Sequence, residues 1–247
     1  MKVFGIQFSD LSASRLADMI VKDAVPAGSG PRIVVTANLD HIVQLRNNAD
    51  FQLAYDRAWA ATADGMPVYL YAKIRGAKVP HRVTGSDLFA AIMPELNPAE
   101  HRCYFVASTQ VTADKAANYL YRRGFPRSSV RTFVPPFGFE RDEAISKWLA
   151  KDISGHRSTH LFFGVGAPKS EIWTDRNRFE IGDCYVLNIG AGLDFFVGEK
   201  KRAPIFFQRA GLEWLWRFAE EPRRLFPRYF VNSWLLLDAI RLDLKRK

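Results

Sequence analysis

Cysteine is scarce in this 247-residue sequence, which contains only Cys103 and Cys184. Both lie in apolar runs, CYFVA and CYVLNI, that are typical of buried strands. Two buried, reduced thiols are therefore favoured over a disulfide or a metal site, and no other constellation of metal-ligating residues is visible. The sequence predicts neither a disulfide framework nor a bound metal.

Long hydrophobic runs are also missing. No segment approaches the roughly 20 apolar residues that a membrane-spanning helix needs. The first ten residues, MKVFGIQFSD, lack the charged region and apolar core of a signal peptide. With 48% hydrophobic and 25% charged residues, the composition is that of a globular protein with a sizeable core. We expect a protein on the cytoplasmic side of the membrane, touching it only from the surface.

Positive charge is concentrated near the end of the sequence. Residues 199–247 contain 12 Lys and Arg against 6 Asp and Glu, so they carry +6 of the net charge of +9. This region begins with a basic and aromatic stretch, KKRAPIFFQRAGLEWLWRF, at residues 200–218. The asymmetry indicates an anionic partner, which could be phospholipid, nucleic acid or a phosphorylated substrate.

Short apolar runs alternate with longer segments of helical period through most of the sequence. Strands are predicted at RIVVT, AWAATA, RCYFVA, VRTFV, THLFFG and CYVLNIG, with helical patterns between most of them. Because these runs are continuously apolar, they indicate buried parallel strands. The sequence predicts an α/β fold with a Rossmann-like, mostly parallel sheet and helices on both faces. We expect a catalytic domain over residues 1–198 and a helical basic appendage over residues 199–247.

Small polar residues follow the predicted strands, where ligands bind in open parallel sheets. Thr36 and Asn38 follow the first strand, Asp64 follows AWAATA, and the glycine-rich GVGAPKSE follows THLFF. A helix N-terminus after GVGAPK could face a diphosphate, although tight turns alone would also explain its glycines. Asp64-Gly65 alone would favour a simple turn, and His41 and His81 are more typical of structural histidines.

Eight short motifs occur in one order between Thr36 and Arg228, and together they resemble a known family. They are TAN (36–38), ADG (63–65), RVTGSDL (82–88), GVGAPKSE (164–171), GAGLDFFVG (190–198), KRAP (201–204), GLEW (211–214) and EPRRL (221–225). The set resembles the WecG/TagA/CpsF family of bacterial glycosyltransferases. The resemblance implies inverting transfer of a sugar from a UDP-sugar to a polyprenyl-diphosphate-linked saccharide at the cytoplasmic membrane face, as in the synthesis of teichoic acid, common antigen or exopolysaccharide.

The resemblance also implies the roles of individual residues. Asp64 of ADG would be the catalytic base, with Thr36 and Asn38 beside it, and Arg82 would hold the reacting groups or the UDP leaving group. The donor site would include Gly164, Gly166, Lys169, Ser170, Glu171, Asn188, Gly190 and Asp194. Ser170 departs from the glutamine that many relatives have. The sequence contains no D-x-D pair, which favours a metal-independent reaction in which Arg, Lys and backbone N–H groups stabilise the leaving group. No cofactor is expected.

Two interpretations of the basic region compete. Aromatic and basic residues could bind single-stranded nucleic acid, but nothing else in the sequence resembles a nucleic-acid module, so an anionic membrane surface is favoured. The segment from Ser233 to Lys247 is typical of an amphipathic docking helix or of a terminal helix packed on the core. Four arginines are candidates to contact the acceptor diphosphate or UDP: Arg202, Arg223, Arg224 and Arg228.

Two alternatives to a transferase stay open. A non-catalytic protein that binds a nucleotide sugar or an anionic lipid would share the same motifs. A nicotinamide-dependent oxidoreductase is disfavoured, because GVGAPK lacks the third glycine of G-x-G-x-x-G. The sequence does not specify the donor sugar, the acceptor saccharide, the polymer or whether the protein forms a homo-oligomer.

Overall fold

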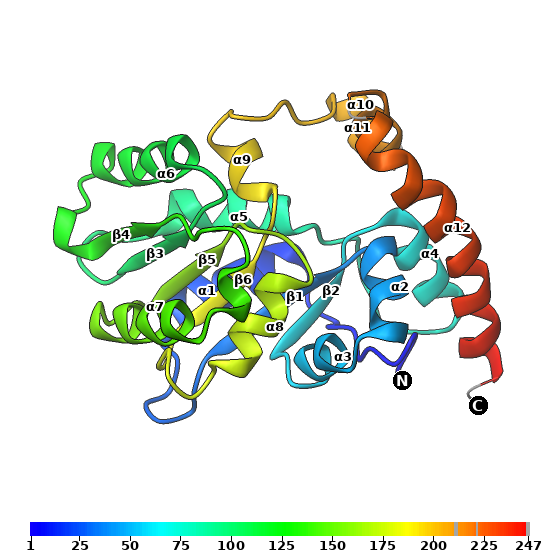
Figure 1. Cartoon of the computed structure of the whole chain (residues 1–247), viewed down its shortest axis with the longest axis horizontal. Helices are drawn as coiled ribbons and strands as arrows, with labels where there is room; N and C mark the ends of the chain where they lie inside the picture. Colours follow the sequence, from blue (N-terminus) through cyan, green and yellow to red (C-terminus); the bar gives the residue numbers. More distant parts are fainter. Residues whose placement is uncertain (210–211, 221, 246–247) are drawn as a thin grey trace.

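The computed structural model describes residues 1–209, 212–220 and 222–245, without the side chains of residues 209, 214, 217 and 223–234. Its centre is a six-stranded parallel sheet with the order β2-β1-β6-β5-β3-β4 (Figure 1). The strands are β1 (Arg32–Ala37), β2 (Ala60–Ala63), β3 (Cys103–Val106), β4 (Val130–Phe133), β5 (His160–Phe163) and β6 (Tyr185–Asn188). The predicted α/β fold is confirmed, and every strand pair of the sheet is parallel.

Helices cover both faces of the sheet, and each face has its own apolar core (Figure 1). Alternate residues of β1 point to opposite faces, so that Ile33 and Val35 enter one core and Val34 enters the other. The helices that pack on the first face are α2 (Leu39–Asn47), α3 (Ala49–Asp56), α4 (Met66–Ile74), α7 (Glu143–Gly155) and α8 (Lys169–Arg176). Those on the second face are α1 (Ala13–Lys22), α5 (Gly85–Ile92), α6 (Gln110–Arg122) and α9 (Gly192–Phe196).

Both cysteines are buried in these cores and are not joined to each other. Burial raises the pKa of the Cys184 thiol to about 12 and raises that of Cys103 as well. Both thiols are therefore protonated at neutral pH, as inert buried cysteines should be.

Local signals in the sequence fix several helix ends. The Thr109 hydroxyl accepts a hydrogen bond from the backbone N–H of Thr112, and it therefore caps α6. Gly124 follows α6 with φ of 89°, a conformation that favours glycine. Pro168 precedes α8 as its N-cap residue.

The C-terminal region forms α10 (Ile205–Arg209), α11 (Glu213–Glu220) and the long α12 (Pro222–Lys245). The last turns of α12 pack against α2, where Ala239 is buried. The buried Asp243 carboxylate accepts hydrogen bonds from the Phe4 N–H at 2.6 Å and the Tyr71 hydroxyl at 3.0 Å. These contacts favour a terminal helix packed on the core, while Leu237 on the same helix is 60% exposed. The division of the chain at residue 198 stays a prediction.

The two edges of the sheet are protected in different ways. At β2, the N–H of Ser9 donates to the carbonyl of Ala61, so the N-terminal segment covers part of that edge. At β4, Arg131 is paired with Asp152 of α7, with 2.5 Å between Nη1 and Oδ1. Both strands are four residues long. Among the described residues, no helix has the length and apolar character to cross a membrane.

Candidate active site

The loops that follow β1, β2, β5 and β6 converge at the carboxyl ends of the strands. A Cβ atom on Gly85 would lie 3.4 Å from Thr36 Oγ1 and 3.6 Å from the Cα of Ile189. A Cβ atom on Gly190 would lie 3.6 Å from the Cα of Gly166. A Cβ atom at either position would be in ordinary van der Waals contact, so the segments pack directly against each other. The structure therefore brings Thr36, the first turn of α5 and the glycine loops of β5 and β6 together.

Asp64 lies at the end of β2, in the middle of this convergence. Its backbone N–H donates to the carbonyl of Ala37, and its Oδ2 accepts a long hydrogen bond of 3.4 Å from the N–H of Gly85. Gly85 begins α5, whose N-terminus favours a negative charge. The side chain is half-buried. A partly accessible carboxylate at strand ends can accept a proton from a bound hydroxyl.

Thr36 and Asn38 lie beside Asp64, as predicted from the sequence. Thr36 is buried at the end of β1. Asn38 caps α2, because its Oδ1 accepts a hydrogen bond of 3.2 Å from the N–H of His41. A Cβ atom on Gly65 would lie 3.4 Å from the Cα of Asn38, which places the ADG turn directly against this cap.

Arg82 connects Asp64 to the C-terminal segment. Its Nη1 donates to the carbonyl of Asp64 at 3.3 Å, and its Nη2 donates to the carbonyl of Gln208 at 3.2 Å. Asp87, which lies five residues further along the chain, pairs instead with Arg202 at 2.7 Å. The half-buried guanidinium is close enough to Asp64 to share a ligand with it.

The GVGAPKSE loop divides into an accessible part and a buried part. Gly164 is tightly packed, since a Cβ atom there would lie 3.0 Å from Leu193 Cδ2, whereas Gly166 has φ of 84° and room for a Cβ atom. Lys169 begins α8, and its ammonium lies 5.7 Å from the ring centre of Phe137, which is fully exposed. Nothing in the sequence predicted a role for this ring. Its position beside Lys169 makes it a candidate contact for a flat ligand group.

Ser170 and Glu171 are buried, with exposed fractions of 0% and 2%. The Ser170 hydroxyl donates to Glu171 Oε2 at 3.2 Å. Burial raises the pKa of Glu171 to about 7, and the hydrogen bonds from Ser170 and the Glu171 backbone oppose that rise. These two side chains are predicted donor-site residues, yet in this structure they lie beneath the loop and not on its surface.

Asn188 and Asp194 are also buried and contact neighbouring elements. Asn188 Nδ2 donates to Thr174 Oγ1 at 3.2 Å, while no described residue bonds its Oδ1. Asp194 Oδ1 accepts from Thr112 at 2.9 Å and from Ser108 at 3.2 Å. Asp194 therefore fastens α9 to the start of α6. A direct role of either side chain in donor binding stays a prediction.

Of the four arginines predicted to contact phosphates, the structure describes the side chain of Arg202 alone. Arg202 lies 2.7 Å from Asp87 and 3.9 Å from Glu213, and these two ion pairs join the start of the C-terminal region to α5 and α11. The side chains of Arg223, Arg224 and Arg228 lie outside the described residues. In the parts of the chain with described side chains, no cluster of three His, Cys, Asp or Glu could hold a metal ion.

Sequence reasoning missed Tyr55, which follows no predicted strand and matches none of the eight motifs. Tyr55 belongs to α3 and is buried, and its hydroxyl lies 2.7 Å from Nδ1 of His41. The contact depends on the packing of α2 against α3, so a local pattern could not reveal it.

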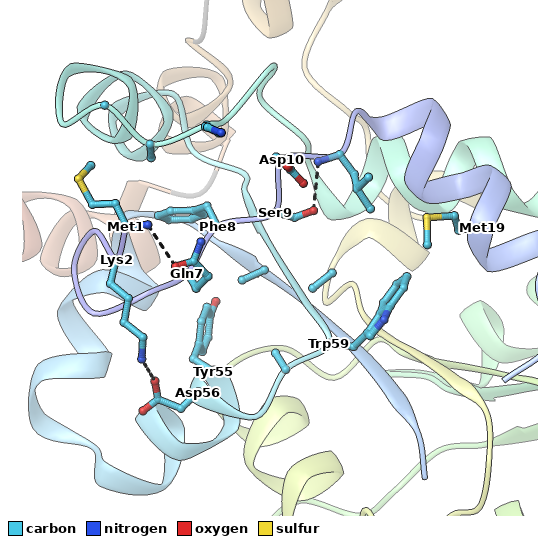
Figure 2. A pocket seen from close by; sticks show the side chains of 17 residues that line it. Met1, Lys2, Gln7, Phe8, Ser9, Asp10, Met19, Tyr55, Asp56 and Trp59 are labelled. Carbon is cyan, nitrogen blue, oxygen red and sulfur yellow. Dashed lines mark hydrogen bonds and ion pairs between the residues drawn. The ribbon is translucent and has the colours of Figure 1, made fainter. Parts of the chain in front are cut away.

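A cavity of about 680 Å³ lies along the edge strand β2, where Ala60 and Ala61 are among the residues that line it. Figure 2 shows Tyr55 and Trp59 lining it, together with Lys2, which forms an ion pair with Asp56. None of the predicted site residues lines this cavity. We place the active site at the carboxyl ends of the strands, where the carboxylate, the arginine and the glycine loops meet.

Sequence comparisons find known proteins that are similar to this chain. A sequence model described as the glycosyl transferase WecG/TagA/CpsF family matches residues 1–247. An N-acetylglucosaminyldiphosphoundecaprenol N-acetyl-beta-D-mannosaminyltransferase of Bacillus spizizenii strain W23 is 26% identical over 191 residues, which cover 77% of this chain and 72% of the relative. A protein of the same name from Staphylococcus aureus strain MW2 is 23% identical over 225 residues, covering 90% of this chain and 85% of the relative.

Proposed function

Since the chain belongs to the WecG/TagA/CpsF family of glycosyl transferases, we propose that it moves a sugar from a UDP-sugar to a polyprenyl-diphosphate-linked saccharide. The names of the two relatives supply the first pair to test, with N-acetylmannosamine as the transferred sugar and N-acetylglucosaminyl-diphosphoundecaprenol as the acceptor. The observation that carries the proposal is the position of Asp64 at the strand ends, beside Arg82 and the N-terminus of α5.

In the proposed reaction, Asp64 takes the proton of an acceptor hydroxyl as that oxygen attacks the anomeric carbon. The new carbon–oxygen bond forms as the bond to the UDP β-phosphate breaks, and its electron pair leaves with UDP. One carboxylate suffices for this direct displacement, which inverts the anomeric centre. Glu171 is 2% exposed, which argues against its acting as a second, nucleophilic carboxylate.

We place the UDP group between Arg82 and the exposed part of the GVGAPK loop. Arg82 and Lys169 would offset the charge that develops on the leaving diphosphate, and backbone N–H groups of the loop would add hydrogen bonds. The exposed Phe137 ring, 5.7 Å from the Lys169 ammonium, offers a face on which the uracil could stack. We further propose that no divalent metal is needed, so dialysis against EDTA should leave the rate unchanged.

We propose that α10 touches the membrane from the cytoplasmic face. Ile205 and Phe206 are 65% and 74% exposed, and the exposed Lys200 and Lys201 lie shortly before them in the chain. Apolar side chains at headgroup depth next to cations favour an anionic bilayer. Replacing Ile205 and Phe206 by serine should reduce flotation of the protein with vesicles that contain anionic phospholipid. Unchanged flotation would contradict this assignment.

The test of the proposed function is release of UDP from a panel of UDP-sugars mixed with the lipid-linked acceptor. Asp64→Asn keeps the size of the side chain but removes the proton acceptor. It should therefore lower turnover about 10²- to 10⁴-fold, while the free energy of unfolding changes by less than about 1 kcal/mol. Turnover and urea unfolding are measured on the same preparations.

Asp18→Asn is the matched control, because Asp18 is an exposed acid on α1 that pairs with Lys22. It should turn over like the wild-type protein. Wild-type turnover in Asp64→Asn would disprove the base assignment. Binding of UDP-sugar without any UDP release would instead favour the non-catalytic alternative.

A further inference from the structure

Helix α4, which follows the ADG turn directly, has an apolar outer face. On its inner face, Val68 and Ala72 are fully buried, each with an exposed fraction of 0%. Leu70 and Ile74 lie on the opposite side of the helix, where residues four apart share one face, and they are 50% and 82% exposed. The helix therefore packs one apolar face on the core and presents a second one outward.

The segment that contains α4 is basic along its whole length. Residues 65–86 include four Lys and Arg and no Asp or Glu. Two of these cations, Lys73 and Lys78, are exposed, and neither is paired with an acid among the described side chains. The Lys73 ammonium lies 5.6 Å from the ring centre of Tyr69. The outer face of α4 thus combines exposed apolar side chains with positive charges that have no counter-charge.

This helix is a close neighbour of the candidate base. It begins two residues after Asp64, and Ile74 lies about 12 Å further along the helix axis. Arg82, near the end of the basic segment, donates to the carbonyl of Asp64 at 3.3 Å and to that of Gln208 in α10 at 3.2 Å. Both α4 and α10 therefore lie next to the turn that carries Asp64.

We propose that the outer face of α4 is a second membrane-contacting surface, which lies on an anionic bilayer and turns Asp64 toward the lipid headgroups. The inference rests on the proposed function, because a polyprenyl-diphosphate acceptor stays anchored in the bilayer and keeps its phosphates at the membrane surface. Leu70 and Ile74 enter the boundary between headgroups and acyl chains, and Lys73 and Lys78 contact lipid phosphates. Contact beside the base brings the acceptor diphosphate within its reach.

Charge disfavours a second copy of the chain as the partner of this face. A two-fold interface would bring Lys73 and Lys78 close to the same lysines of the other copy, and like charges repel. Residues 65–86 offer no acid that could pair with them. An anionic lipid surface, in contrast, matches both the apolar side chains and the charges.

The first test places an environment-sensitive fluorophore on Ile74→Cys in the full-length protein. The native thiols do not compete for the label, because Cys103 and Cys184 are buried. Vesicles of phosphatidylglycerol mixed with phosphatidylcholine should shift the emission to the blue, and phosphatidylcholine alone should shift it less. Phe179→Cys is the matched control, because Phe179 is 87% exposed but lies in the connection from α8 to the amino end of β6. A label there should show no shift.

The second test compares the binding of paired variants to the same mixed vesicles. Leu70→Ser/Ile74→Ser should bind about 10-fold more weakly than the wild-type protein, because both apolar side chains leave the membrane boundary. Lys73→Gln/Lys78→Gln should also bind about 10-fold more weakly at low salt, and this difference should shrink as salt is added. Flotation with the vesicles measures both losses.

Val111→Ser and Lys151→Gln are the matched controls for this comparison. Val111 is 52% exposed on α6, which lies at the opposite end of the molecule from α4 (Figure 1), and Lys151 is exposed on α7. Both variants should bind like the wild-type protein.

The absence of a blue shift at Ile74→Cys, or an equal shift at Phe179→Cys, would overturn the inference. Wild-type binding by both paired variants would overturn it as well. A dimer that Leu70→Ser/Ile74→Ser dissociates without any change in vesicle binding would assign this face to a second copy instead. Neither test contains a sugar donor, so failure of the proposed function would appear separately, as the absence of UDP release.

Discussion

The two ends of the parallel strands both contain buried titratable side chains, but they use them differently. At the amino ends of β3 and β5, His101 and His160 stack edge to face, with ring centres 4.9 Å apart. Their Nε2 atoms lie 3.1 Å from the carbonyl of Val21 and 2.9 Å from that of Ile20, respectively. Each ring thus holds the last turn of α1 against the sheet.

At the carboxyl ends, the buried groups contact each other and the loops of the candidate site. Glu171 accepts from a neighbouring serine, Tyr55 meets His41, and Asn188 Oδ1 has no partner among the described residues. Burial lowers the pKa of His160 to about 3 and raises that of Glu171 to about 7. Both groups are therefore biased toward the neutral form, but only Glu171 titrates close to neutral pH. The comparison indicates that one end stabilises the fold and the other retains groups that can respond to a ligand.

The largest expected effect at the structural end comes from His160→Ala. It removes a ring that is 98% buried along with its hydrogen bond to Ile20, which should lower the free energy of unfolding by about 2–4 kcal/mol. Urea unfolding measures this loss. Turnover per folded molecule should not change, and His81→Ala, at an exposed histidine, should leave stability within about 0.5 kcal/mol. A variant that stays folded but loses turnover would contradict the purely structural role assigned to the amino ends of the strands.

The second expected effect is an opposite pH dependence of stability at the two ends. The folded-state pKa of His160 is below the usual value. Its contribution to the free energy of unfolding is therefore complete above about pH 6.5 and is lost as pH falls toward 3. The folded-state pKa of Glu171 is raised. Its contribution to the free energy of unfolding is therefore complete below about pH 4.5 and is lost as pH rises through 7. Each slope is at most about 1.4 kcal/mol per pH unit.

These two slopes oppose each other between about pH 4.5 and 6.5, so variants are needed to separate them. Unfolding free energies measured across that range should fall with rising pH more steeply in His160→Gln than in the wild-type protein. In Glu171→Gln they should rise with pH. Parallel curves for all three proteins would show that neither group titrates as its burial implies.

The smallest expected effect comes from Ser170→Ala, at the carboxyl ends of the strands. The Ser170 hydroxyl lowers the pKa of Glu171 by bonding its carboxylate, so its removal should raise that pKa. The loss of stability that Glu171 causes as pH rises should then extend to a pH a few tenths of a unit higher, as urea unfolding across the pH range would measure. A loss that ends at lower pH would contradict the effect assigned to the Ser170 hydroxyl.

The sequence was sufficient to predict the sheet, because its strands are short, continuously apolar runs. It also placed Thr36, Asn38 and Asp64 at one edge, since the carboxyl ends of parallel strands coincide. It could not predict that Glu171 is buried, because the side chain belongs to a loop motif that looks solvent-facing. The ion pairs of Arg202 with Asp87 and Glu213 depend on tertiary packing and carry no local signal.

The edges of the sheet have a consequence for association between copies of the chain. An open strand edge offers unpaired N–H and carbonyl groups to any other extended chain, and this is how many β-proteins aggregate. Here the segment before α1 already occupies part of the β2 edge through Ser9. At β4, the strand carries a charged side chain, Arg131, that is held in an ion pair with Asp152. The chain should thereby resist strand exchange with other copies of itself.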